Sequence, residues 1–78
     1  MNYALKVAED GKISIDVSKS GNKYTVSVWD KAEHKSRGSR YFTTYEKAHE
    51  SFLAEARKHG VAENIKDVDH DPNDFNFD

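Results

Sequence analysis

Apolar and polar residues alternate along the first part of the chain, and this period of two is typical of β-strands. The alternating apolar positions are Tyr3, Leu5 and Val7, followed after a turn by Ile13, Ile15 and Val17. A three-residue loop at 9–11 keeps both sets on one face, because it places Val7 opposite Ile13. Gly11 then takes the left-handed conformation of a bulge. The pattern therefore predicts a β-hairpin with one apolar face.

Two further strands follow this hairpin. The apolar positions of the third strand are Tyr24, Val26 and Val28. Pairing Val17 with Tyr24 preserves the apolar face and leaves a four-residue loop at 19–22, which contains turn-forming residues. Residues 37–43 predict a fourth strand, in which Phe42 faces the core and Tyr41 faces away from it.

The segment after the fourth strand has the spacing of an amphipathic helix. Thr43 and Glu46 have the separation of a capping box, and Gly60 is suited to end the helix in a left-handed conformation. The apolar stripe of this helix consists of Tyr45, Ala48, Phe52, Leu53 and Ala56. Because the stripe can cover the apolar face of the sheet, we predict an α+β fold. It has an antiparallel sheet of about four strands and one main helix packed on one face.

The C-terminal part is less regular. Val61, Ile65 and Val68 are spaced i, i+4, i+7, which fits either a short further helix or a short edge strand. From Asp67 onward the chain is rich in Asp and Asn, a composition typical of a flexible tail. The sequence thus predicts one α+β domain over residues 1–66 and an acidic, flexible tail over residues 67–78.

Composition and charge narrow the class of protein. A chain of 78 residues forms one small domain with a thin core. It has no cysteine, which excludes disulfides and thiolate chemistry, and no apolar run long enough to cross a membrane. No signal-peptide pattern is visible, so we expect a cytoplasmic protein.

Residues 1–60 carry 11 Lys or Arg and 8 Asp or Glu, whereas residues 61–78 carry one Lys and six acids. The body is therefore mildly basic and the tail acidic.

The sheet face that points away from the helix is the main candidate for binding. Trp, Tyr and Arg are the residue types enriched in binding hot spots. The candidate partner-binding residues on this face are Asp16, Thr25, Trp29, Arg37, Ser39 and Tyr41. The alternative is that Trp29 covers the open end of the core. A second candidate contact is the tail, where Phe75 and Phe77 stand among acids that include Asp71 and Asp74. These tail residues could dock on a basic partner or cover their own sheet.

Motifs for catalysis or metal binding are not found. The spacing of Asp67, Asp69 and Asp71 resembles a calcium loop, but Pro72 stands where that loop needs glycine. The four histidines have no metal-ligand spacing, no serine lies in a nucleophile elbow, and no glycine-rich phosphate loop is present. We therefore expect no catalytic residue, no metal, no cofactor and no enzymatic activity.

The segment 13–52 resembles short phage anti-CRISPR proteins that inhibit the type I-F surveillance complex. The resemblance rests on Gly21, Lys23, the run Lys35-Ser36-Arg37-Gly38-Ser39-Arg40-Tyr41-Phe42, and the helix residues Glu46 and Phe52. It covers about half of the chain. It implies a monomeric, non-enzymatic inhibitor that binds the backbone subunits of the Cascade complex in the infected host cell and blocks target-DNA binding. No contact residue is transferred, because the exposed aromatic and acidic residues that this family uses for binding do not recur in the chain. Ala4, Ser18 and Trp29 stand at those positions.

A second resemblance is to the plant-type AP2 and integrase arm-binding domains, which have three strands followed by one helix. It rests on Thr43-Thr44-Tyr45-Glu46-Lys47-Ala48 at the start of the helix. It implies that the outward sheet face enters the DNA major groove. Trp29, Arg37 and Tyr41 would then read bases, with Lys12, Lys35 and Arg40 on phosphates. We take the inhibitor as the first hypothesis and this DNA-binding module as the alternative.

Overall fold

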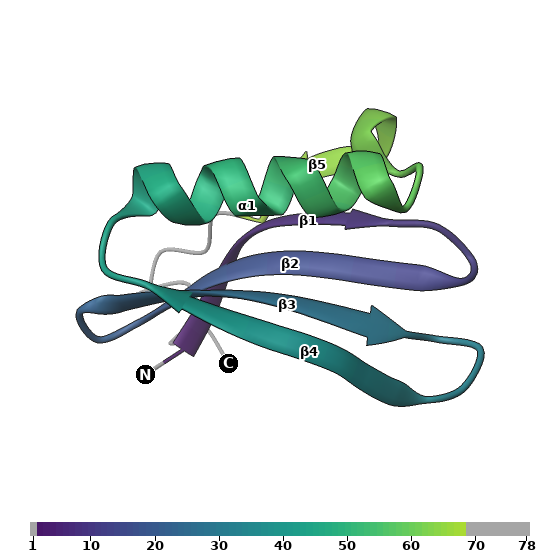
Figure 1. The fold of residues 1–78 in the computed structure, drawn as a ribbon, viewed down its shortest axis with the longest axis horizontal. Coiled ribbons are helices and arrows are strands. Elements are labelled where there is room, and N and C mark those ends of the chain that lie inside the picture. Colours follow the sequence, from purple (N-terminus) through teal and green to yellow (C-terminus); the bar gives the residue numbers. More distant parts are fainter. Residues whose placement is uncertain (1, 69–78) are drawn as a thin grey trace, which may run out of the picture.

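The computed structural model describes residues 2–68, which form one antiparallel sheet and one main helix (Figure 1). The strands are β1 (Asn2–Glu9), β2 (Ile13–Ser20), β3 (Lys23–Asp30), β4 (Lys35–Phe42) and β5 (Ile65–Asp67). Helix α1 (Tyr45–Lys58) follows β4, and a short 3-10 helix (Ala62–Asn64) precedes β5. The strand order is β4-β3-β2-β1-β5, so β4 and β5 are the edges of the sheet. The predicted α+β class is confirmed, with a fifth strand added to the four expected.

Helix α1 packs on one face of the sheet, mainly over β2 and β3 (Figure 1). Of its predicted apolar stripe, Ala48, Phe52 and Ala56 are fully inaccessible to solvent, whereas Tyr45 and Leu53 are partly buried. The buried sheet residues beneath it are Ala8, Ile13, Ile15, Val17, Val26 and Val28. Phe42 packs against the edge of this core, and its neighbour Tyr41 points away, as predicted.

The pairing of β1 with β2 differs from the predicted register. Val7 lies opposite Asp16 rather than Ile13, and Ala8 takes the buried position opposite Ile15. The predicted three-residue loop is wrong because the turn is made by residues 11–12 and closed by a 3.0 Å hydrogen bond from the Asp10 N–H to the Ile13 carbonyl. The Asp10 carboxylate also accepts from the N–H groups of residues 12 and 13 at 2.7 and 2.9 Å. The φ of Gly11 lies outside the left-handed region, so its predicted role is also wrong.

A bulge in β1 compensates for this shift. Between Ala4 and Lys6 the register with β2 changes by one residue, which leaves Leu5 in contact with the core. A β-bulge changes which face of the sheet the following residues occupy. The alternation of apolar and polar residues in the sequence does not reveal where such a bulge lies. The sequence therefore predicted the inward position of Leu5 but not the outward position of Val7.

The hairpin of β2 and β3 has the predicted apolar face but a shorter turn. Val17 pairs with Val26 rather than Tyr24, and the connection is the two-residue turn at 21–22. Gly21 has a φ of +61°, a conformation that glycine adopts at little cost in tight hairpins. Because the shift is an even number of residues, every side chain keeps its predicted face.

The helix ends are built from local hydrogen bonds. Thr44, not Thr43, is the N-cap, and its hydroxyl accepts from the Lys47 N–H at 3.4 Å. The predicted capping box of Thr43 and Glu46 is therefore wrong, because the residue three positions after Thr44 is Lys47, which cannot accept a hydrogen bond from the cap N–H. At the other end Gly60 has a φ of +74°, as predicted, and the N–H of the buried Val61 donates to the carbonyl of residue 56 at 2.8 Å. The Gly60 N–H also donates to the Arg57 carbonyl at 3.2 Å, and the two bonds form a Schellman motif, which satisfies carbonyls in the last turn of the helix.

The chain after α1 returns to the sheet as a short edge strand, the second of the two alternatives for this segment. Strand β5 pairs with residues 6–8 of β1, and the Val68 N–H donates to the Leu5 carbonyl at 2.8 Å. Asp67 Oδ1 lies 3.0 Å from Lys6 Nζ, and this hydrogen bond raises the pKa of Lys6. Asp67, the first residue of the predicted tail, is therefore part of the sheet.

Candidate functional site

The sheet face opposite α1, called the outer face below, is not covered by any helix of residues 2–68 (Figure 1). The strand register arranges its residues in three neighbouring rows across β1 to β4. The central row contains Val7, Asp16, Ser27 and Ser39. The rows on either side contain Ala4, Ser18, Thr25 and Tyr41, and Glu9, Ser14, Trp29 and Ser36.

Hydroxyl side chains occupy the centre of the outer face. Ser27 Oγ and Ser39 Oγ lie 3.0 Å apart, which makes a hydrogen bond between β3 and β4. A shallow hollow of about 350 Å³ lies beside them, lined in part by Ser18, Thr25 and Tyr41. A hydroxyl can both donate and accept a hydrogen bond. This centre can therefore adapt to either kind of polar group on a partner.

Two aromatic side chains stand on either side of the serine pair. Trp29 on β3 is 43% exposed and Tyr41 on β4 is 70% exposed, and their rows flank the row of Ser27 and Ser39. Trp29 lies between Ser14 and Ser36 on the outer face, so it does not cover the end of the core. Exposed Trp and Tyr are the residue types most enriched in binding hot spots.

Asp16 lies half-buried at the centre of the outer face, between Val7 and Ser27. Burial raises the pKa of this carboxyl group, because the surrounding protein disfavours the charged form. No cation within residues 2–68 forms a salt bridge with it. A carboxylate without an ion-pair partner on an open face is available to accept hydrogen bonds from another molecule.

Arg37 is the one described candidate that the structure moves to the other side of the sheet. The register between β3 and β4 shifts between Val28 and Trp29, so Arg37 is the extra residue of a bulge. Its Nε lies 3.5 Å from Asp30 Oδ2, and it borders a groove next to Glu55 on α1. The expectation that Arg37 shares a face with Trp29 and Tyr41 is therefore wrong. The isolated Gly38, with a φ of +139°, was the sequence signal for this bulge.

The cations of β4 also face the helix side. Lys35 pairs with Asp30 and Arg40 pairs with Val26, both at positions that face α1, whereas Lys12 lies in the exposed turn before β2. The charged residues of the outer face are Glu9, Asp16, Lys23 and Lys66, together with Lys31, whose ammonium group pairs with the Glu9 carboxylate. The outer face thus carries a mixture of acidic and basic side chains. Sequence reasoning missed the positions of Val7 and Lys66 on it.

The remaining expectations fall partly outside the described residues. The tail candidates Asp71, Asp74, Phe75 and Phe77 lie outside residues 2–68. Within that range, no three His, Asp or Glu side chains are grouped so that they could hold a metal ion. No helix of residues 2–68 has the length and apolar character needed to cross a membrane.

Comparison of the chain with known protein families, curated proteins and solved structures gave no match. Inference about function therefore depends on the surfaces of the molecule.

Proposed function

We propose that this chain is a non-enzymatic binding protein that contacts a protein partner through its outer face. The observation that carries the proposal is the pair of exposed aromatic side chains, Trp29 and Tyr41, on either side of a hydroxyl-rich centre. A polyanionic partner would favour a face that is mainly basic, whereas this face mixes acidic and basic side chains. A protein surface with its own mixture of hydroxyls and charges fits it better.

The resemblance to the anti-CRISPR family supplies the specific partner. The proposed function is inhibition of a type I Cascade surveillance complex, of subtype I-F, by a single copy of the chain that blocks target-DNA binding. The site of action would be the cytoplasm of the infected host cell. Strand β4, which carries the longest run of the resemblance, also bears Tyr41 and Ser39.

A plaque assay tests this proposal directly. The chain is expressed in bacteria whose type I-F system targets a phage, and the number of plaques is compared with that of cells lacking the chain. We expect plaques to return, and we expect Trp29→Ala and Tyr41→Ala to reduce the effect. A hot-spot residue contributes about 2 kcal/mol or more, so each substitution should weaken binding to the purified complex roughly 30-fold.

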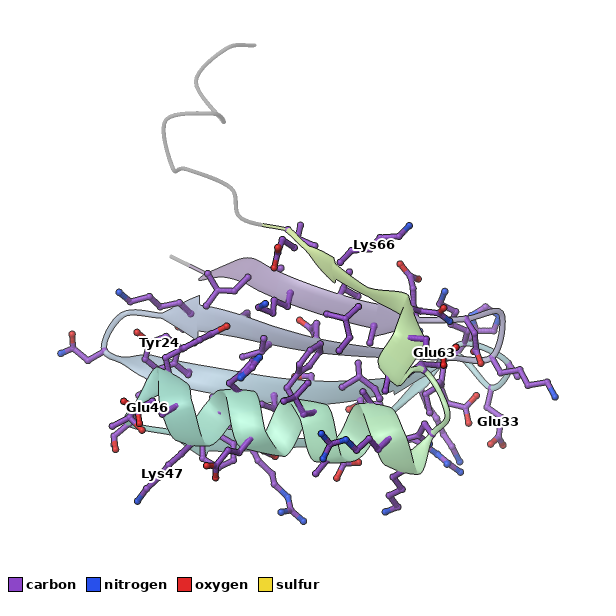
Figure 2. The ribbon with its side chains drawn as sticks, turned by 90° about the horizontal axis from the view of Figure 1, so that it is seen from above. Tyr24, Glu33, Glu46, Lys47, Glu63 and Lys66 are labelled. Carbon is purple, nitrogen blue, oxygen red and sulfur yellow. The ribbon has the colours of Figure 1, made fainter. Side chains whose placement is uncertain are left out.

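Lys47→Ala is the matched control, because Lys47 is exposed on α1, away from the outer face (Figure 2). This variant should inhibit as well as the unmodified chain. The proposal of Cascade inhibition is wrong if the folded chain restores no plaques in any of several type I subtypes. The wider proposal of an outer binding face is wrong if Lys47→Ala and Trp29→Ala weaken binding to the purified partner equally.

A DNA-binding module remains the second candidate, because β2, β3 and β4 followed by α1 reproduce the element order of the AP2 and integrase arm-binding domains. The separation of Arg37 and Arg40 from Trp29 weakens this candidate. A gel shift with duplex DNA at low and physiological salt tests it. The candidate requires binding that falls steeply with salt and that is lost in Trp29→Ala.

A further inference from the structure

A groove runs between strand β4 and helix α1, on the side of the sheet opposite the outer face. Its floor contains the buried side chains of Val26 and Val28, and its volume is about 200 Å³. A second hollow shares Val28, Arg37 and Lys58 with it and extends the groove toward His59 at the end of the helix. The groove is therefore elongated along β4 rather than closed around one point.

Basic side chains form both walls of this groove. Arg37 and Arg40 come from β4, and Lys58 comes from the last turn of α1. Glu55 is the one acidic side chain in the lining, and its Oε1 lies 3.6 Å from His59 Nε2. Within residues 2–68, neither Arg40 nor Lys58 forms a salt bridge. Lys47 extends the same flank of the helix, on the side away from β5 (Figure 2).

The wall opposite the helix is open because of the bulge in β4. Gly38 has no side chain, and a Cβ atom placed there would meet no other atom within 4 Å. Its φ of +139° is a conformation that other residues rarely adopt. At Gly38 the backbone between the two arginines therefore has no side chain, which lets a ligand approach the groove floor.

From this geometry we infer that the groove binds the sugar–phosphate backbone of a nucleic-acid strand. Arginine guanidinium groups match the oxygens of a phosphate with paired hydrogen bonds, and lysine supplies a further point charge. Arg37 and Arg40 are three residues apart on an extended strand, which corresponds to about 10 Å. Cations spread along a groove suit a ligand with repeated charges better than one small anion, which needs donors that converge.

An acidic peptide is the main competing ligand, and the structure of β4 disfavours it. A peptide would bind an edge strand best by extending the sheet through regular backbone hydrogen bonds. The bulge at Arg37 interrupts the regular spacing of N–H and C=O groups on β4, and bulges of this kind protect edges from such pairing. A nucleic-acid backbone needs no such regularity, because it contacts side chains.

Fluorescence anisotropy with a labelled 15-nucleotide oligothymidine tests the inference on the full chain. Three phosphate contacts on a single strand predict a salt slope of about −2, so affinity should fall roughly 20-fold between 50 and 200 mM salt. In Arg40→Gln one contact is lost, and the fall over the same range should be only about sevenfold. Lys58→Gln should behave in the same way. Both side chains are exposed, so circular dichroism should show unchanged folding.

Lys23→Gln is the matched control, because Lys23 is an exposed cation on the outer face. It should leave the affinity and the salt slope unchanged, as should Trp29→Ala, which separates this groove from the proposed outer binding face. The inference is overturned if no oligonucleotide binds at 50 mM salt, or if Lys23→Gln lowers the affinity as much as Arg40→Gln. Equal or tighter binding of polyglutamate that also depends on Arg40 would overturn it in favour of an acidic peptide.

Discussion

Replacement of Phe52 by alanine tests the side of the sheet on which the helix lies, and every surface assignment depends on that side. Phe52 is fully buried between α1 and the sheet. The buried helix residues one turn before and after it are Ala48 and Ala56, which are too short to fill the space that a lost ring leaves. Little collapse around the cavity is therefore expected.

The expected cost follows from this limited collapse. Phe→Ala substitutions in cores cost about 3–5 kcal/mol, and the small neighbours place Phe52→Ala in the upper part of that range. A domain of this length has a total stability of about 4–12 kcal/mol, so the variant should retain little of it. Urea unfolding followed by far-UV circular dichroism measures the loss. With a slope of about 1 kcal/mol/M, the midpoint should fall by about 4 M.

Two companion variants make the result decisive. Phe52→Leu should cost only about 1–2 kcal/mol, which keeps a measurable transition if the alanine variant is unfolded in water. Tyr41→Ala removes an aromatic ring from the outer face, where it is 70% exposed, and should change stability by less than about 0.5 kcal/mol. A larger loss for Tyr41→Ala than for Phe52→Ala would mean that the covered and open faces are exchanged.

Three further predictions concern the turns and the titrating groups. Gly60→Ala should lower stability by about 1–2 kcal/mol in thermal unfolding, because the φ of +74° strains any other residue, whereas Gly11→Ala should be nearly neutral. Asp16→Asn should stabilise the fold at pH 7, because burial raises the pKa of Asp16 and its ionised form disfavours folding. Urea titrations should show this gain vanishing as the pH falls below the ordinary pKa of aspartate, near 4. The ammonium group of Lys31 lowers the pKa of Glu9, so the contribution of their ion pair is complete above the ordinary glutamate pKa and is lost as the pH falls through the lowered value. Glu9→Gln should therefore reduce stability at pH 7 by less than about 1 kcal/mol, and this difference should shrink as the pH falls through the lowered pKa of Glu9.

The helix and the apolar face of the central strands could be predicted from the sequence because their patterns are long. The spacing of Ala48, Phe52 and Ala56 repeats over three helical turns, and Ile15 and Val26 belong to uninterrupted alternations. A register error of two residues between β2 and β3 did not matter, because side chains in a strand return to the same face every second residue.

The sides occupied by Val7 and Arg37 could not be predicted by alternation, since each depends on a bulge that shifts the register by one residue. In β1 the shift follows from the turn that Asp10 stabilises with its carboxylate, which is a local geometric preference rather than an apolar pattern. In β4 it follows from Gly38. The groove between β4 and α1 could not be predicted either, because it depends on the bulge that turns Arg37 to the helix side and on the distance between two elements.

The order of the strands also has a consequence for how the molecule folds. Strands β1 to β4 are neighbours in both sequence and space. Each can therefore pair with the strand before it after closure of only a short loop. Strand β5 instead joins β1 across about sixty residues of chain, and it does so with only three paired positions. We expect the four-strand meander and its helix to form first, and β5 to pair with β1 last. The same strand should detach first in local unfolding, which would transiently expose the backbone of β1 to proteases and to hydrogen exchange.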